Sequence, residues 1–307
     1  MNDFPKGGIL LMALLLSAGC VTRHLEPADP DILALSEAGA AAYAAGLPSK
    51  AAVLYSQALE RGRLLDVPRE VARNAYNLGL CRMAAGEWME ARRWLDQARV
   101  LLEPDGEELG RVLVACAETA TRMGDICEAV TLAERVPLVC KETAVRCQAL
   151  VLLAEIHAGE AKWDAVRERY VAARRMCKGT EIPPGLSARQ EGLAARLIGA
   201  GVLKGDRAAC LLRKAELLRK AGSYREMAES LGEAGDAFSA SGRKADAFTC
   251  YERSAHSLDA GGQRVAADVM VGRMRSLAGD LKDSTYIERL ALAERILAAD
   301  KTKGGTP

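Results

Sequence analysis

The sequence predicts an all-α protein, an α-solenoid of about seven helical hairpins that follows a signal peptide. Three features of the sequence support this fold class: its composition, the regular spacing of its helix breaks, and the positions of its prolines. Half of the 307 residues are hydrophobic, only 4% are aromatic, and Ala is abundant. Such a composition favours helices that pack closely through small side chains.

The charge balance argues against one class of partner. The chain has 42 Lys and Arg residues against 41 Asp and Glu residues, a formal net charge of +1. A net charge this small provides no overall basic field for a phosphate backbone, so we expect no nucleic-acid partner. A single compact core usually stops growing near ~250–300 residues, so a helical chain of this length forms either two domains or an open stack of repeats.

Residues 1–19 are predicted to be a signal peptide. Lys6 lies in a short head, the apolar run of residues 9–16 follows, and small residues precede Cys20. The run has eight residues. A membrane-spanning helix needs about 20, so we expect a cleaved targeting segment and not a permanent membrane helix.

The segment Leu16-Ser17-Ala18-Gly19-Cys20 resembles the bacterial lipobox. The resemblance implies that Cys20 receives a diacylglyceryl group and becomes the mature N-terminus, and that residues 20–30 form a lipidated tether. Each buried CH₂ group of the acyl chains contributes about 0.8 kcal/mol, so such an anchor would be stable. Val21 replaces the Asp that retains enteric lipoproteins in the inner membrane. This implies a periplasm-facing position at the outer membrane, with the inner membrane as the alternative.

The rest of the chain has one regular rhythm. Segments of roughly 15 to 18 helix-forming residues alternate with short breaks, as in stacked helical hairpins. One set of breaks falls near Gly46, Gly86, Gly124, Gly159, Gly205, Gly242 and Gly279, and the other falls about midway between them, near residues 66–68, 104–106, 136–137, 183–185, 222–223 and 261–262. These breaks predict a helical repeat domain over residues 31–299, followed by a disordered, polar and Gly-rich tail over residues 300–307.

The prolines respect these breaks, because proline removes a backbone donor and clashes inside a helix. Pro48 fits the first turn of a helix, and connections are expected at Pro68, Pro104, Pro137, Pro183 and Pro184. No further proline occurs before Pro307. Proline therefore marks the second set of breaks independently of glycine.

Small and aromatic residues recur inside the repeats. Gly39, Gly46, Ala51, Tyr55 and Ala58 are followed forty residues later by Gly79, Gly86, Ala91, Leu95 and Ala98, and further copies occur within residues 117–133, 154–173 and 235–251. This pattern resembles the tetratricopeptide repeat, in which small residues let helix A and helix B of a hairpin approach closely. The spacing exceeds the ~34 residues usual in that family. Residues 224–231 also fit a helix B, so two repeat phases stay open after residue 205.

The resemblance implies that the A helices line a concave, protein-binding surface. Some tetratricopeptide proteins hold the terminal carboxylate of a peptide with Asn and basic side chains from consecutive A helices. The groove-facing positions here are Arg73, Tyr76 and Asn77 in the second A helix and Arg111, Glu118 and Arg122 in the third. Arg can bind a carboxylate through two hydrogen bonds and Asn can pair with a peptide backbone, so these six residues form the candidate peptide-binding groove.

Eight cysteines remain besides Cys20, and most suit buried apolar positions. Cys140 and Cys177 lie 19 and 18 residues from the turn at Gly159, on opposite sides. In an antiparallel hairpin they would reach similar levels, so a disulfide between Cys140 and Cys177 is predicted.

No motif indicates a catalytic, metal or cofactor site. The chain has three histidines, none with a second His three or four residues away, and it lacks C-x-x-C, G-x-S-x-G and phosphate-loop motifs. We therefore expect no enzymatic activity, no cofactor and no metal, and no small-molecule substrate is evident.

Together these features predict a lipid-anchored scaffold that binds a protein or peptide in the bacterial cell envelope. An enzyme or accessory subunit acting on envelope glycans is an alternative, and it would need a deep pocket lined by converging carboxylates. A pilotin for secretion or pilus assembly is a further alternative, distinguished by stoichiometric capture of a secretin tail.

Overall fold

The structure is a computed structural model of the chain, and it describes residues 29–102 and 106–303. Within these two ranges the chain forms fourteen α-helices and no β-strand. The all-α solenoid of seven hairpins that the sequence predicts is confirmed. The predicted signal peptide, Cys20 and most of the tether over residues 20–30 lie outside the described residues.

Each hairpin pairs a helix A with a helix B. The first three hairpins are α1 (Pro30–Ala44) with α2 (Pro48–Leu64), α3 (Pro68–Ala84) with α4 (Trp88–Leu101), and α5 (Glu107–Met123) with α6 (Ile126–Val139). The next two are α7 (Thr143–Gly159) with α8 (Trp163–Met176), and α9 (Pro184–Gly199) with α10 (Arg207–Lys220). The last two are α11 (Tyr224–Ala240) with α12 (Lys244–Ala260), and α13 (Arg264–Leu281) with α14 (Ser284–Lys303). α14 thus extends into the tail predicted for residues 300–307.

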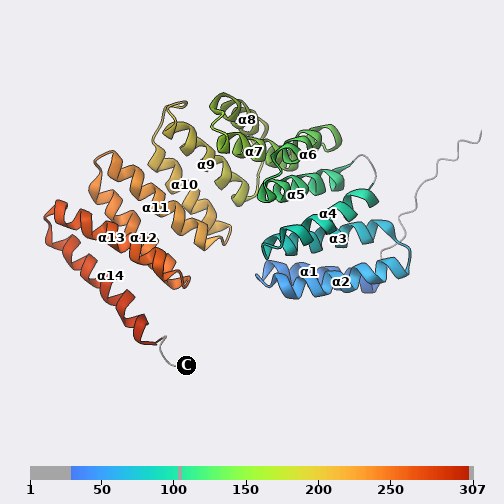
Figure 1. The fold of residues 1–307 in the computed structure, drawn as a ribbon, viewed down its shortest axis with the longest axis horizontal. Coiled ribbons are helices and arrows are strands. Elements are labelled where there is room, and N and C mark those ends of the chain that lie inside the picture. The colour runs from blue at the N-terminus through green and yellow to red at the C-terminus, as the bar shows by residue number, and fades with distance from the viewer. Residues whose placement is uncertain (1–28, 103–105, 304–307) are drawn as a thin grey trace, which may run out of the picture.

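The hairpins follow one another along an arch (Figure 1). Helices α1 and α2 form one end of the arch, and α13 and α14 form the other. Consecutive helices pack against one another along the stack, but α8 packs only lightly against α9, and α7 contacts both of them. Helices α7 and α8 both contact α9 and so connect the two halves of the arch. No helix in the described part of the chain is long and apolar enough to cross a membrane.

Proline marks several of the helix starts, and one proline departs from its predicted place. Pro48, Pro68 and Pro184 are the first residues of α2, α3 and α9, where the missing amide hydrogen has no helical partner to lose. Pro137, expected in a connection, instead lies inside α6, which continues to Val139. Its ring is exposed and lies in the last turn of the helix, so α6 loses one backbone hydrogen bond there without a clash in the core.

Left-handed residues end several of the hairpin turns. Gly46 and Gly86 have φ values of +75°, which glycine adopts without strain. In the fourth hairpin Gly159 is still helical, and Ala161 takes the left-handed conformation with φ of 55°. The turn of that hairpin therefore lies slightly later than the sequence predicts, and it carries a residue that pays a steric penalty.

Glycine also sets the spacing between helices A and B. A methyl group would lie 2.8 Å from the Tyr55 ring if added to Gly39, 2.8 Å from Leu95 if added to Gly79, and 2.5 Å from the Tyr251 ring if added to Gly235. The contact between α11 and α12 thus repeats the contact between α1 and α2. The repeat phase after residue 205 is the one in which α11 is a helix A, and residues 224–231 begin that helix.

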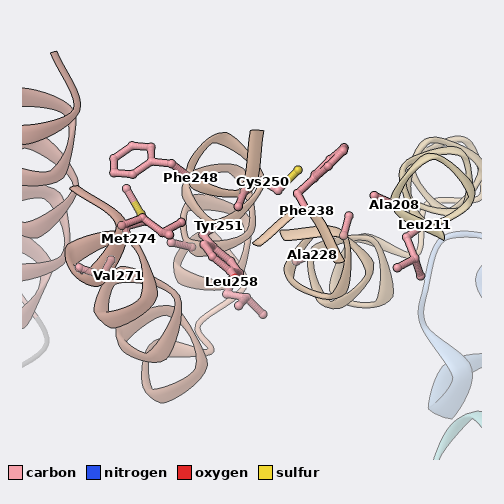
Figure 2. Close-up of a cluster of buried hydrophobic side chains, with 14 of the residues drawn as sticks. Ala208, Leu211, Ala228, Phe238, Phe248, Cys250, Tyr251, Leu258, Val271 and Met274 are labelled. Atoms are coloured by element: carbon pink, nitrogen blue, oxygen red, sulfur yellow. The ribbon is translucent and has the colours of Figure 1, made fainter. Parts of the chain in front are cut away.

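The core consists of local clusters that each span a few neighbouring helices. One of them extends from α9 to α14 and includes Phe248, Tyr251 and Met274 (Figure 2). Phe248 is fully buried, and its ring meets the edge of the Tyr286 ring with 4.9 Å between the centroids. Each hairpin covers the apolar face of the next, as expected in repeat proteins.

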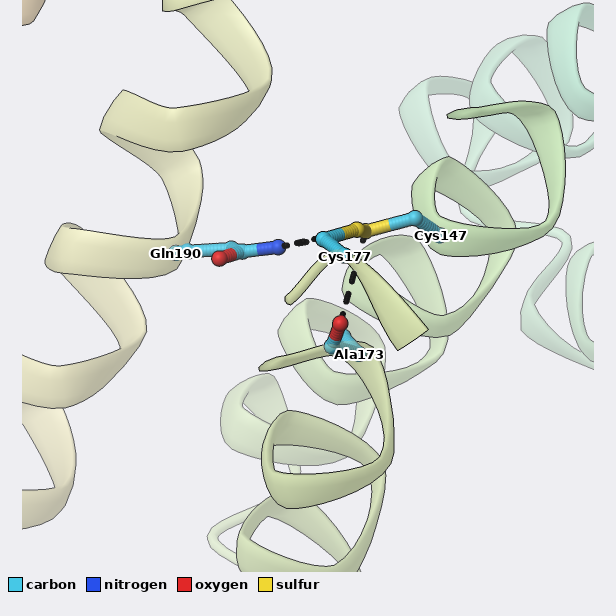
Figure 3. The surroundings of a disulfide bond; sticks show 4 residues. All are labelled: Cys147, Ala173, Cys177 and Gln190. Atoms are coloured by element: carbon cyan, nitrogen blue, oxygen red, sulfur yellow. Dashed lines mark hydrogen bonds between the residues drawn. A yellow bond between two sulfur atoms is a disulfide. The ribbon is translucent and has the colours of Figure 1, made fainter. Parts of the chain in front are cut away.

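The disulfide differs from the prediction. Cys147 of α7 is bonded to Cys177 at the C-terminal end of α8 (Figure 3). Cys140 is a buried free thiol that follows α6 and donates a hydrogen bond to the Glu107 carboxylate at 2.7 Å. The predicted pair was wrong because the prediction assumed a helix break at Pro137, which would place Cys140 inside the next helix. Helix α6 instead continues to Val139. Helix α7 begins only three residues after Cys140, so Cys147 is the cysteine that faces the end of α8.

Candidate functional site

Four of the six predicted groove residues line one hollow between α3 and α5. The hollow has a volume of about 390 Å³, and its lining comprises Ala72, Arg73, Tyr76, Asn77, Leu102, Glu108, Arg111 and Val112. Arg73, Tyr76 and Asn77 share one face of α3, because they lie three and four residues apart. Arg111 reaches the same hollow from α5, the helix A of the next hairpin.

The arginines of this hollow already hold carboxylates of the chain. Arg73 contacts Glu70 at 3.2 Å and Glu108 at 3.4 Å, and Arg69 donates two hydrogen bonds to Glu108 at 3.1 and 3.2 Å. Arg111 donates to Glu142, the residue before α7, at 2.7 Å. Burial opposes ionisation of Glu108, but hydrogen bonds from Arg69 and Arg73 outweigh it and lower its pKa.

These ion pairs are exposed enough to be exchangeable. The side chains of Arg73 and Arg111 are 45% and 51% exposed. Ion pairs at such positions contribute about 0–1 kcal/mol each, because water screens them. A carboxylate from a ligand can therefore replace Glu108 or Glu142 at small cost.

Tyr76 and Asn77 supply the unpaired polar groups of the hollow. Burial raises the pKa of Tyr76 to about 12, so its hydroxyl stays protonated and can donate a hydrogen bond. Neither the Tyr76 hydroxyl nor the Asn77 amide has a hydrogen-bond partner among the described residues. With Ala72, Leu102 and Val112 as apolar lining, the hollow offers both polar and apolar contacts to a ligand.

The other two predicted groove residues lie elsewhere. Glu118 accepts hydrogen bonds from Arg189 of α9 at 2.6 Å and from Gln148 of α7 at 3.5 Å. The Arg122 guanidinium lies 5.9 Å from the centre of the Trp88 ring of α4. Glu118 therefore belongs to a junction between hairpins and Arg122 packs on a neighbouring helix B, so neither side chain lines the hollow.

Arg189 bridges all three helices at the junction of α5, α7 and α9. Arg189 bonds Glu118 and also Glu155 of α7, with 2.5 Å between its Nη2 and Oε2 of Glu155. Burial opposes the charge of Arg189, but its hydrogen bonds to Glu155 outweigh burial and raise its pKa. The next residue, Gln190, is buried and donates to Cys147 Sγ at 3.1 Å (Figure 3). These contacts join α9 to α7 where packing between α8 and α9 is weak.

Sequence reasoning missed the ion pairs that join successive hairpins. Pairs such as Arg92–Glu128, Glu134–Arg169, Asp206–Arg243 and Glu252–Arg289 are 35 to 37 residues apart in the chain. This separation matches the repeat length, so opposite charges at repeat spacing are the signal that could have identified them.

The hollow contains one carboxylate, Glu108, among the described residues that line it. A glycan hydrolase would instead require two converging carboxylates. Across residues 29–102 and 106–303, no group of three or more His, Cys, Asp or Glu side chains is arranged to hold a metal ion. A second hollow, of about 340 Å³, lies among α2, α3 and α4 and is lined in part by Val53, Arg82 and Trp94.

The described residues thus form a tetratricopeptide-like α-solenoid with an arginine-rich hollow between its second and third A helices. No protein-family model and no curated protein sequence matches the chain.

Solved structures show the likeness in fold. A Rap protein complexed with competence and sporulation factor has a TM-score of 0.51 and 10% identity, over 88% of this chain and 76% of that chain. The tetratricopeptide-repeat domain of P58(IPK) has 15% identity over 87% of this chain and 88% of that chain, but its TM-score of 0.33 is too low to establish a shared fold.

Proposed function

We propose that this protein is an adaptor that binds an extended segment of another protein on its A-helix face. The observation that carries the proposal is the hollow between α3 and α5, where Arg73, Tyr76, Asn77 and Arg111 come together. Two exchangeable guanidinium groups and two unpaired polar groups suit a peptide that carries a carboxylate, because Arg binds carboxylates through paired hydrogen bonds.

Binding would proceed by exchange of ion pairs. A peptide carboxylate would take the place of Glu108 at Arg73 or of Glu142 at Arg111, while the Asn77 amide pairs with the peptide backbone. The Tyr76 hydroxyl would donate to a carbonyl or carboxylate oxygen of the peptide. An apolar side chain of the peptide would cover Leu102 and Val112. Recognition of this kind needs little sequence specificity, which suits an adaptor.

We further propose that a lipid on Cys20 anchors this adaptor to the outer membrane with its repeats facing the periplasm. The proposal rests on the apolar run of residues 9–16 and the small residues before Cys20. Cys20→Ala should leave an unprocessed precursor in cells, whereas the native chain should partition with membranes and yield a lipid-modified N-terminal peptide by mass spectrometry. A mature N-terminus without lipid would rule out the anchor and leave the adaptor proposal intact.

The binding site can be tested by crosslinking in living cells. A photoreactive amino acid at position 77 should crosslink a protein partner, and the same amino acid at Val265, which is 83% exposed on α13, should not. The double variant Arg73→Gln with Arg111→Gln should reduce the crosslink about tenfold, since two half-exposed ion pairs together contribute up to about 2 kcal/mol. Tyr76→Phe, which removes only a hydroxyl, should cause a smaller loss.

A matched pair of arginines controls for the change in charge. Arg219 and Arg243 are 56% and 51% exposed and are paired with Glu216 and Asp246. Arg219→Gln with Arg243→Gln should leave the crosslink unchanged. An equal loss in both double variants, or no loss in either, would place the partner outside the hollow.

A further inference from the structure

The charges of this chain are segregated, although the whole chain is nearly neutral. Residues 162–220 contain 14 Lys and Arg residues against 6 Asp and Glu residues, a net charge of +8. The remainder of the chain contains 28 Lys and Arg residues against 35 Asp and Glu residues, a net charge of −7. The net charge of the whole chain therefore conceals a strongly basic section that comprises α8, α9 and α10.

The basic side chains concentrate on the two B helices of this section. α10 carries five basic residues and one acidic residue, and α8 carries four basic residues and two acidic residues. Arg167 and Arg174 of α8 are seven residues apart, as are Arg213 and Lys220 of α10. A spacing of seven residues is two helical turns, so each pair shares one face of its helix.

The two helices meet at a single carboxylate. Arg174 contacts Glu191 of α9 at 3.5 Å, and Arg213 contacts the other oxygen of Glu191 at 2.9 Å. Tyr170 of α8 packs against the core cluster of α10 and joins the two helices at this point. The Glu191 side chain is only 13% exposed, whereas Arg174 and Arg213 are 54% and 57% exposed. Two cations thus share one largely buried anion and face the solvent with excess positive charge.

Further cations around this point are not neutralised. The exposed side chains of Arg167, Arg175, Lys178 and Lys220 form no ion pair or hydrogen bond with any described residue. We call the surface formed by Arg167, Arg174, Arg175, Lys178, Arg213 and Lys220 the basic face. It comprises exposed cations of α8 and α10, together with Lys178 just after α8, around their junction at Glu191.

The basic face lacks exposed apolar side chains. Sixteen large hydrophobic residues are exposed in the described part of the chain, yet none lies between Leu138 and Tyr224. A partner that buries apolar area, or a membrane that takes up apolar side chains next to basic ones, would require such residues here. A ligand of this face would therefore have to be recognised through charge.

We propose that the basic face of α8 and α10 docks an acidic polypeptide segment. Arg174 and Arg213 already hold the Glu191 carboxylate, so their guanidinium groups are oriented for the carboxylates of Asp and Glu side chains. The flanking unpaired cations attract such a segment and steer its approach. This surface is distinct from the hollow between α3 and α5, and it gives the adaptor a second attachment point for a partner of defined charge.

The experiment uses residues 21–307 and a fluorescent decaglutamate peptide as the probe. Fluorescence anisotropy at low salt should detect binding that weakens steadily as salt is added, and a decalysine peptide should not bind. The test variant is Arg167→Glu with Lys220→Glu, because neither side chain has a described partner that the substitution would strand. It should weaken decaglutamate binding about tenfold or more, since two attractions become two repulsions.

The matched control is Lys50→Glu with Arg135→Glu, an exposed Lys on α2 and an exposed Arg on α6 that likewise have no described partner. It changes the net charge by the same amount and should alter the affinity by less than about twofold. Equal weakening by the test and control variants would overturn the proposal, because it would show attraction to net charge and not to this face. Binding of phosphatidylglycerol vesicles or of an oligonucleotide through the same residues, without binding of decaglutamate, would also overturn it.

Discussion

Replacing Gly235 with Ala tests whether glycine sets the distance between α11 and α12. The added methyl group would lie 2.5 Å from Cε1 and 2.7 Å from Cδ1 of Tyr251. The ring has little room to move away, because Tyr251 is buried and its hydroxyl donates a hydrogen bond to Asp236 at 2.7 Å. The helices must therefore separate, or the Tyr251 side chain must leave its position and lose this hydrogen bond.

The two contributions to stability have opposite signs. Overpacking of a core costs about 1–3 kcal/mol, and so short a contact with a held ring belongs at the upper end of that range. Ala is favoured over Gly in a helix interior by about 1 kcal/mol. We therefore expect Gly235→Ala to lower the free energy of unfolding by about 2 kcal/mol.

Gly272→Ala is the matched control. Gly272 also lies inside a helix, but a methyl group there would meet nothing within 4 Å. This variant should raise the free energy of unfolding by up to about 1 kcal/mol. Urea unfolding followed by far-UV circular dichroism measures both variants, and hydrogen exchange of α11 and α12 detects local loosening if the stack does not unfold in one step. This expectation would be refuted if Gly235→Ala left the free energy of unfolding unchanged while Gly272→Ala raised it.

Three further outcomes are expected. Ala161→Gly should raise the free energy of unfolding by about 0.5–1 kcal/mol, because it removes the strain of an alanine with φ of 55°; a lower melting temperature would contradict this. Peptide mapping without reduction should recover Cys147 linked to Cys177, and Cys140 should be alkylated only after unfolding because burial raises the pKa of its thiol to about 11; recovery of Cys140 linked to Cys177 would exclude the observed pairing. Burial raises the pKa of Tyr251 to about 12, so its stabilising effect should be complete below the ordinary tyrosine pKa of about 10 and be lost as the pH rises toward 12. A near-ultraviolet titration should show late phenols from Tyr76 and Tyr251, of which Tyr251→Phe should lose one, and ionisation of every tyrosine near pH 10 in the folded chain would be inconsistent with this.

The sequence predicts part of the candidate site. Arg73, Tyr76 and Asn77 meet because they are three and four residues apart on α3, and helical periodicity places such residues on one face. Arg111 joins them because it occupies the corresponding helix of the next hairpin. Glu118 shares helix α5 with Arg111, but Arg189, which is 71 residues away in the chain, bonds its carboxylate at the junction of α5, α7 and α9. No local pattern in the sequence indicates that contact.

The predicted disulfide failed for a related reason. Counting residues from a turn requires helix ends that are correct to within about one turn, and Pro137 lies within α6 instead of ending it. Helix α7 begins at Thr143, three residues after Cys140. Cys140 therefore lies outside this helix, and Cys147 is the cysteine opposite Cys177. Proline inside a last turn is tolerated more easily than in the middle of a helix, and the sequence alone does not distinguish these cases.

The sequence by itself determined the all-α class, the seven hairpins, and the close approach of helices at Gly39, Gly79 and Gly235. These features depend on backbone conformation and on contacts between adjacent helices, which local composition and spacing encode. Only the tertiary structure decided which hairpin phase holds after residue 205, which cysteine bonds Cys177, and which charges pair across hairpins. Those outcomes depend on how successive hairpins rotate and bend relative to one another, and small rotations accumulate along the stack to bring distant residues such as Glu118 and Arg189 together.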